Sequence, residues 1–181
     1  HHAFADAGQG FCVFNDVAVA ARVQLAEGHA RRVLVIDCDV HQGNGTASIF
    51  ADDVRVFTFS IHGDRNFPFR KCDGDLDIAL ADGIADPVYL EVLRTALREQ
   101  LPLAEVDCVF YLAGADPFAG DRLGRLSLSK GGLAARDELV IHSCRSFGKP
   151  VTVVMAGGYA RNINDIVDIH TQTVKIAAAV R

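Results

Sequence analysis

A short apolar run that ends abruptly in charged residues most constrains how this chain can fold. Val33-Leu34-Val35-Ile36 has the unbroken apolar character of a buried strand, and Asp37, Asp39 and His41 follow it almost directly. Because alternate residues of an extended chain share a face, these three side chains can point the same way. Buried charges are costly unless something compensates them, and a metal cation does so economically. The segment therefore predicts a metal site at the end of a buried strand.

The rest of the chain alternates between strand-like and helix-like segments. We expect strands at 33–38, 54–61, 107–113 and 150–155, and helices at 15–28, 46–51, 86–101, 129–147 and from 162 onward. Residues 62–86 are polar and contain proline, which favours a long loop. Unbroken apolar strands separated by helices predict an α/β fold of three layers (αβα), with a mostly parallel sheet covered on both faces.

Several helix boundaries carry capping residues. Asn15 or Asp16, Asp86, Ser129 and Asn162 are each placed to accept hydrogen bonds from a first helical turn. The residues expected on the buried side of the last helix are Ile163, Ile166, Val167, Ile169 and Val174.

Unusual residues follow three of the expected strands: Asp37, Asp39 and His41 after the first, Asp116 after the third, and Gly158 and Tyr159 after the fourth. In a parallel sheet the carboxyl ends of the strands share one edge, where open α/β sheets bind their ligands. Asp39, His41 and Asp116 would together offer two carboxylates and one imidazole at that edge. Three protein ligands with an open position are typical of catalytic zinc, and Fe²⁺ accepts the same ligands, so both metals fit. Water bound to such a metal becomes a nucleophile near neutral pH.

A histidine pair and a tyrosine can complete a hydrolytic site. His1 and His2 can divide the duties of base and acid, and Tyr159 can donate to a developing oxyanion. Each feature also has an ordinary explanation, since the histidine pair is typical of a tag remnant and Tyr159 of a packed aromatic residue. Asp121 and Arg122 are expected to brace the loop after Asp116.

Composition excludes some classes of function. The 181 residues, half of them apolar, suffice for one domain spanning 1–181, and the net charge of −5 argues against direct nucleic-acid binding. The chain has no apolar run of membrane-spanning length. Its five cysteines are dispersed without a C-x-x-C pair, which indicates reduced thiols and a cytoplasmic location. The oligomeric state is not indicated.

Five ordered motifs resemble those of zinc-dependent histone deacetylases. They are His1-His2, the segments 10–16 and 37–46, Gly114-Ala115-Asp116 and Gly157-Gly158-Tyr159. Gln42, where most members have a second histidine, and the segments 120–129 and 136–139 are similar to class IV members and their bacterial relatives.

The resemblance implies the arginase/deacetylase fold, here lacking its N-terminal part, and hydrolysis of acetyl or longer acyl groups from lysine side chains. Metal-bound water would attack the amide carbonyl, and the substrates would be acylated proteins or peptides, with acyl-polyamines as a further class. By motif position the Zn²⁺ ligands would be Asp39, His41 and Asp116.

The resemblance also assigns the remaining site residues. His2 would be the general base, His1 its partner in protonation, and Tyr159 would polarise the carbonyl. Asp37 would orient His1 and, with Ser60, hold K⁺, while Asn44 would contact His2 where class I enzymes have aspartate. The substrate channel would be lined by Gly10, Phe11, Phe67 and Gly158.

Two alternatives stay open at this point. A ureohydrolase on the same fold would need two manganese ions and further aspartate and histidine ligands. A non-catalytic acyl-peptide binding module would need only the pocket. We also expect the native protein to be longer than 181 residues, because the family carries a substantial segment before the histidine pair. An isolated fragment would be weakly active or inactive.

Overall fold

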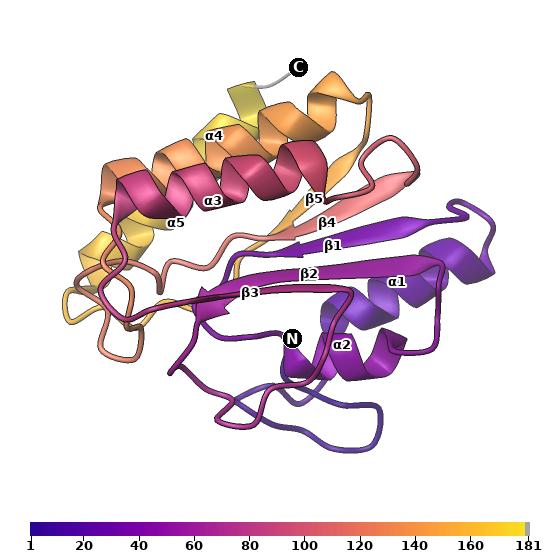
Figure 1. The fold of residues 1–181 in the computed structure, drawn as a ribbon, viewed down its shortest axis with the longest axis horizontal. Helices are drawn as coiled ribbons and strands as arrows, with labels where there is room; N and C mark the ends of the chain where they lie inside the picture. The colour runs from indigo at the N-terminus through magenta and orange to yellow at the C-terminus, as the bar shows by residue number, and fades with distance from the viewer. Residues whose placement is uncertain (180–181) are drawn as a thin grey trace.

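One parallel sheet forms the centre of the computed structural model, which describes residues 1–179. Its strands are β1 (Val33–Asp37), β2 (Val56–Gly63), β3 (Leu76–Leu80), β4 (Cys108–Leu112) and β5 (Val151–Val154). They lie in the order β3-β2-β1-β4-β5, so β1 is central (Figure 1). In the register, Asp37 at the end of β1 pairs with Ser60 of β2 and Leu112 of β4.

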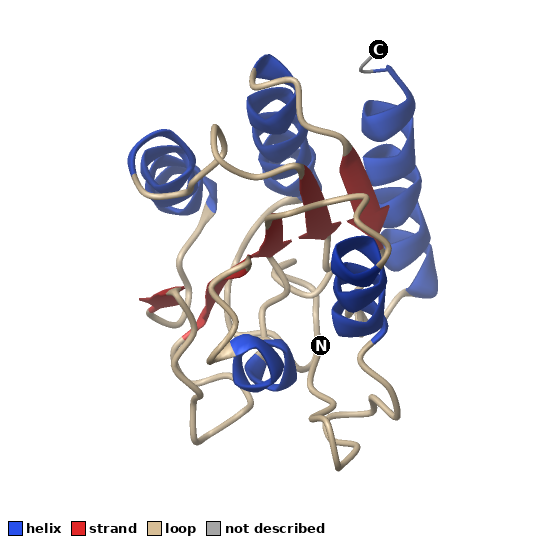
Figure 2. Ribbon diagram, turned by 90° about the vertical axis from the view of Figure 1, so that its right-hand side faces the viewer, coloured by secondary structure: helices blue, strands red, loops and turns tan. Residues whose placement is uncertain are grey.

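Helices cover both faces of this sheet. On one face lie α1 (Asp16–Ala26) and α2 (Asn44–Phe50), and on the other lie α3 (Asp86–Glu99), α4 (Lys130–Ser146) and α5 (Ile163–Ala179) (Figures 1 and 2). Because successive strand residues point to opposite faces, Val33 and Val35 of β1 pack in one core, and Leu34 and Ile36 in the other. The predicted three-layer αβα architecture is confirmed.

Strand β3 corrects the expectation of a loop across 62–86. It lies at the edge of the sheet, and its exposure alternates: Asp77 and Ala79 are exposed, whereas Leu76 and Ile78 are half-buried and Leu80 is buried. An edge strand with one covered face has no unbroken apolar run. The search for unbroken apolar runs finds strands that are buried on both faces, and it therefore missed the strand at residues 76–80.

Helix caps agree with the sequence in part. Asn15 accepts from the Ala18 amide (3.0 Å) at α1, and Ser129 accepts from the Gly132 amide (2.9 Å) at α4, as predicted. Asp86 is wrong as a cap, because it is the first residue of α3 and its carboxylate binds Ser129 instead. It accepts from the Ser129 amide (2.8 Å) and hydroxyl (2.6 Å), and so ties the start of α3 to that of α4.

The buried face of α5 also differs from the prediction. Ile169 is buried, but Ile163, Val167 and Val174 are more than half exposed. Thr173 lies in the core instead, where its hydroxyl donates to Asp137 (2.5 Å). Thr173, which is polar but hydrogen-bonded to Asp137, is therefore buried where the apolar periodicity predicted its neighbour Val174.

Two further features bear on the class of protein. None of the helices within residues 1–179 has both the length and the hydropathy needed to cross a bilayer. All five cysteines are free, in agreement with the expected reduced thiols.

Replacing Leu93 by alanine tests the packing of α3 against the sheet. Leu93 is fully buried, so Leu93→Ala should lower the free energy of unfolding by about 2–5 kcal/mol, as measured by urea denaturation. The control Val88→Ala, on the same helix but half exposed, should change it by about 0.5 kcal/mol or less. Equal losses would contradict this assignment of the buried face.

Candidate functional site

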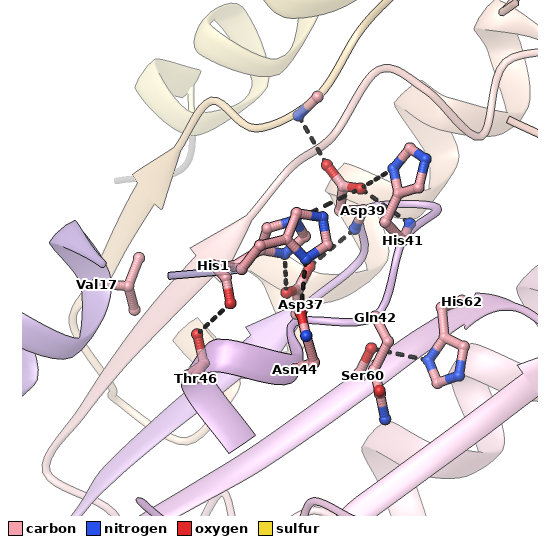
Figure 3. Close-up of polar contacts among 12 residues, drawn as sticks. His1, Val17, Asp37, Asp39, His41, Gln42, Asn44, Thr46, Ser60 and His62 are labelled. Atoms are coloured by element: carbon pink, nitrogen blue, oxygen red, sulfur yellow. Dashed lines mark hydrogen bonds and ion pairs between the residues drawn. The ribbon is translucent and has the colours of Figure 1, made fainter. Parts of the chain in front are cut away.

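Three predicted residues converge at the carboxyl edge of the sheet. Asp39 and His41 follow β1, and Asp116 follows the neighbouring strand β4. One possible ligand atom from each lies within 4.8 Å of the others, and all three side chains are buried. His41 Nδ1 is 3.0 Å from Asp39 Oδ1 and 3.1 Å from Asp116 Oδ2 (Figure 3 shows Asp39 and His41).

Backbone amides fix the two carboxylates. Asp39 Oδ2 accepts from the Gly157 amide (2.7 Å), and Asp116 Oδ1 accepts from the Val40 amide (2.9 Å). Gly157 has no room for a side chain, because a Cβ there would lie 2.0 Å from Asp116 Oδ2. The loop after β5 can therefore close over both carboxylates only with glycine at this position.

The electrostatics of the three residues show how strongly negative charge gathers here. Burial opposes protonation of His41, but hydrogen bonds to Asp116 and Asp39 outweigh it and raise the pKa of His41 to about 10. Burial, and then the charge of Asp39, raise the pKa of Asp116 to about 7. Burial alone would raise the pKa of Asp39, yet His1 and His41 hold it well below its usual range.

The donor set suits a divalent metal. Two carboxylates and one imidazole are a known ligand set of catalytic zinc and of Fe²⁺. A cation at these atoms would take the place of the proton that His41 shares with the two carboxylates. Among residues 1–179, only this group combines three such ligands within reach of one ion. The residues therefore fit a single-metal centre.

The histidine pair lies beside this group. His1 Nδ1 bonds Asp37 Oδ2 (2.6 Å), His2 Nδ1 bonds Asn44 Oδ1 (2.8 Å), and the two rings are 4.0 Å apart. The predicted pairings of Asp37 with His1 and of Asn44 with His2 are thus present, the first of them in the labelled cluster of Figure 3. Since the Asn44 amide nitrogen donates to Gln9 (2.6 Å), its oxygen faces His2, and Nδ1 of His2 must carry the hydrogen.

The two histidines have opposite charge states. Burial opposes protonation of His1, but Asp37 and Asp39 outweigh it and raise the pKa of His1 to about 10. Burial and the charge of His1 lower the pKa of His2 to about 4. At neutral pH, His1 is therefore a cation and His2 is neutral, with Nε2 available to accept a proton.

A cavity of about 420 Å³ opens above the site and contains His2, His41 and Tyr159 in its lining. The predicted channel residues Gly10, Phe11 and Phe67 line this cavity as well. Phe67 lies edge-on to His2, with ring centres 4.9 Å apart.

Gly10 and Phe11 form the tip of a small hairpin beside the cavity. Gln9 and Cys12 exchange backbone hydrogen bonds of 3.0 and 2.8 Å, and Gly10 and Phe11 have φ of 54° and 66°. Positive φ is uncommon for a phenylalanine and marks a locally strained backbone. The turn leaves Phe11 87% exposed, with its ring centre 6.1 Å from that of Tyr159.

The family resemblance also assigned Gly158 to the channel. It is not among the residues that line the cavity, and a Cβ there would approach Ile166 (3.0 Å) and Ala115 (3.1 Å). The close approach of α5 accounts for a glycine at this position.

Tyr159 is held by its backbone. Its amide donates to Asp121 Oδ2 (2.6 Å), and its carbonyl accepts from Arg122 Nε (2.9 Å). Asp121 and Arg122, which we expected to brace only the loop after Asp116, thus also fix Tyr159. Burial, and then Asp39 and Asp116, raise the pKa of Tyr159 to about 12, so its phenol stays a donor at neutral pH.

Asp37 and Ser60, the expected K⁺ ligands, line a small void. This void holds only about 10 Å³ and lies between β1, β2 and the start of α2. Ser60 Oγ is 2.9 Å from His62 Nδ1, and Asp37 Oδ1 accepts from the Asp39 amide (3.0 Å). The structure thus places Asp37 and Ser60 side by side on neighbouring strands.

Sequence reasoning placed one wall of the cavity in the loop of residues 62–70, but it missed the residue that fixes this wall. Asn66 is 3% exposed, donates to the Leu123 carbonyl (2.8 Å) and accepts from the Arg125 amide (3.2 Å). It thereby joins the loop after β2 to the loop after β4. An asparagine in a polar loop gives no sequence signal of such a contact, which depends on two segments 57 residues apart.

A buried arginine was also missed. Arg136 of α4 is fully buried and donates to the carbonyls of Gly114 (2.6 Å) and Cys38 (3.3 Å), next to the ligand loops. Its Nε donates to Asp137 (2.9 Å), which also accepts from the Tyr111 hydroxyl (2.5 Å). Arg136 therefore holds the backbone of the two loops that carry Asp39 and Asp116.

Comparison with known proteins finds a family whose sequence pattern this chain matches. The sequence pattern of the histone deacetylase domain matches residues 1–174. An uncharacterized protein of Picosynechococcus sp. is 48% identical over 94% of this chain and 57% of its own length. Histone deacetylase 2 of Arabidopsis thaliana is 32% identical over 90% of this chain and 43% of its own length.

Comparison with solved structures finds proteins of similar fold. A histone deacetylase homolog from Aquifex aeolicus covers 98% of this chain and 50% of its own, with a TM-score of 0.84 and 27% identity. Acetylpolyamine aminohydrolase from Burkholderia pseudomallei covers 99% of this chain and 54% of its own, with a TM-score of 0.84 and 25% identity. The chain thus spans about half the length of the relatives it matches.

The buried ion pair of α4 can be tested by urea denaturation. Arg136→Met leaves the Asp137 carboxylate buried without its cation and should lower the free energy of unfolding by about 3–5 kcal/mol. Adding Asp137→Asn removes that stranded charge and should recover part of the loss. A double variant no more stable than Arg136→Met would argue against an electrostatic cause.

Proposed function

Because the chain belongs to the histone deacetylase family, we propose that it carries the catalytic centre of a metal-dependent amidohydrolase that removes acetyl or longer acyl groups from lysine side chains. The observation that carries the proposal is the convergence of Asp39, His41 and Asp116 beside a neutral His2, at one end of a cavity wide enough for a side chain.

We propose that Asp39, His41 and Asp116 hold Zn²⁺, with Fe²⁺ as the second metal their chemistry accepts. The bound metal would polarise the amide carbonyl and acidify the attacking water. K⁺ beside Asp37 and Ser60 is a further proposal, supported by their shared void.

The chain's own residues supply the proton transfers. His2 accepts the proton of the attacking water at Nε2, because Nδ1 is committed to Asn44. His1, held as a cation by Asp37, stabilises the negative charge that develops. The Tyr159 phenol donates to the carbonyl oxygen as it becomes an oxyanion.

The shape of the cavity supports a lysine substrate. The aliphatic stem of an acyl-lysine is long and apolar, and Phe11 and Phe67 offer it aromatic walls. The Burkholderia relative is an acetylpolyamine aminohydrolase, so acyl-polyamines are the second substrate class. The five free cysteines favour a cytoplasmic location.

The two other hypotheses have less support. A ureohydrolase needs a second metal site, whereas one group of three ligands is present among residues 1–179. A binding module without catalysis needs no base and no oxyanion donor, whereas His2 and Tyr159 both line the cavity.

Metal binding can be measured without turnover. Asp116→Asn should weaken Zn²⁺ binding on the order of 10²-fold or more, in a competition titration with a chromogenic chelator, because one anionic ligand is lost. The control Asp52→Asn, an exposed carboxylate just after α2 that is outside the ligand group, should leave the affinity unchanged. A stoichiometry of two metals per chain would favour the ureohydrolase instead.

Turnover is best tested with lysine peptides acylated from acetyl to myristoyl. Tyr159→Phe removes one hydroxyl and should lower kcat on the order of 10²-fold, with the metal content unchanged. Near-wild-type turnover would remove Tyr159 from the mechanism. Peptide binding without release of acyl groups by the wild type would favour the binding module.

A further inference from the structure

Two arginines stand at the mouth of the catalytic cavity, and the proposed chemistry does not use them. Arg65 comes from the loop after β2 and Arg125 from the loop after β4, and both line the cavity that contains His41 and Tyr159. Their side chains are 75% and 53% exposed, whereas His2 and His41 are buried. The arginines therefore mark the outer rim, and the histidines mark the floor.

The charge at this rim is only partly balanced. Both guanidinium groups approach the same oxygen of Asp82, Arg125 at 3.2 Å and Arg65 at 3.9 Å. Within the described part of the chain, the lining of the cavity contains no aspartate or glutamate. Two cations facing one carboxylate leave a net positive charge, with guanidinium donors still exposed to an incoming ligand.

The backbone beneath the arginines is well fixed. Asn66 bonds the backbone of Leu123 and Arg125, so the two loops that carry the arginines are linked. The Lys71 ammonium donates to three carbonyls of the Arg65 loop, those of Asp64 (3.0 Å), Asn66 (2.7 Å) and Pro68 (2.6 Å). A ligand that meets both arginines thus need not order the loops first.

We propose that Arg65 and Arg125 select acyl-lysine substrates that carry a carboxylate next to the modified lysine, supplied by an aspartate or glutamate side chain. The proposal rests on the proposed function of the same site. Guanidinium groups pair with carboxylates through paired, charge-assisted hydrogen bonds. The same charge repels ammonium groups, so the rim disfavours acyl-polyamines and lysine-rich peptides.

The test compares three acetyl-lysine peptides that differ only in the flanking residues, which are aspartate, asparagine or lysine. Exposed ion pairs are weak, so kcat/KM should favour aspartate over asparagine about five-fold, and aspartate over lysine on the order of tenfold. Both preferences should shrink as salt is added, because the arginines are exposed. Each measurement uses the full-length protein.

Charge reversal provides the matched control. The double variant Arg65→Glu with Arg125→Glu should invert the order of the three peptides. Arg98→Glu makes the same kind of change on the exposed last turn of α3, outside the cavity lining, and should keep the wild-type order. Unchanged order in the double variant would overturn the proposal.

Binding separates this inference from the proposed reaction. Fluorescence anisotropy of the labelled peptides reports affinity whether or not they are hydrolysed. Equal affinity for all three peptides in the wild type would overturn selection by charge. A preference for the aspartate peptide without any turnover would support the selection and overturn the proposed hydrolysis instead.

Discussion

Compensation of buried negative charge is the constraint on which the rest of the site depends. Asp37, Asp39 and Asp116 are all buried at one edge of the sheet. His1 neutralises the first of them, and His41 lies between the other two. The same charges give the two histidines different charge states: the carboxylates stabilise the cation on His1, and burial together with that cation lowers the pKa of His2, which stays neutral.

The sheet makes this concentration of charge feasible. Because β1 and β4 are parallel neighbours, residues more than seventy positions apart in the sequence meet at the same edge of the sheet. Backbone amides then take up the remaining carboxylate oxygens, and Gly157 allows one of those amides to come close. Polar groups that would be costly alone are thus satisfied as a set.

Much of the architecture could be predicted from the sequence, because strands buried on both faces leave unbroken apolar runs and their ends expose unusual residues. The edge strand β3 was missed since it buries only one face. Their positions at the ends of expected strands indicated Asp39, His41 and Asp116, whereas the separate roles of His1 and His2 came from the family resemblance. Asn66 and Arg136 were not foreseen, because their importance arises from contacts with segments 57 to 98 residues away.

The proposed metal ligands lie in the loops after two different strands, so a bound cation would link the stability of the fold to the supply of that cation. Asp39 and Asp116 belong to the loops after β1 and β4, so an ion bound to both cross-links the centre of the molecule. Such an ion favours the folded state by mass action, by about 4 kcal/mol when its free concentration is a thousand times the dissociation constant. If the proposed site binds its metal, removal of that metal would then lower the fraction of folded protein as well as the proposed activity.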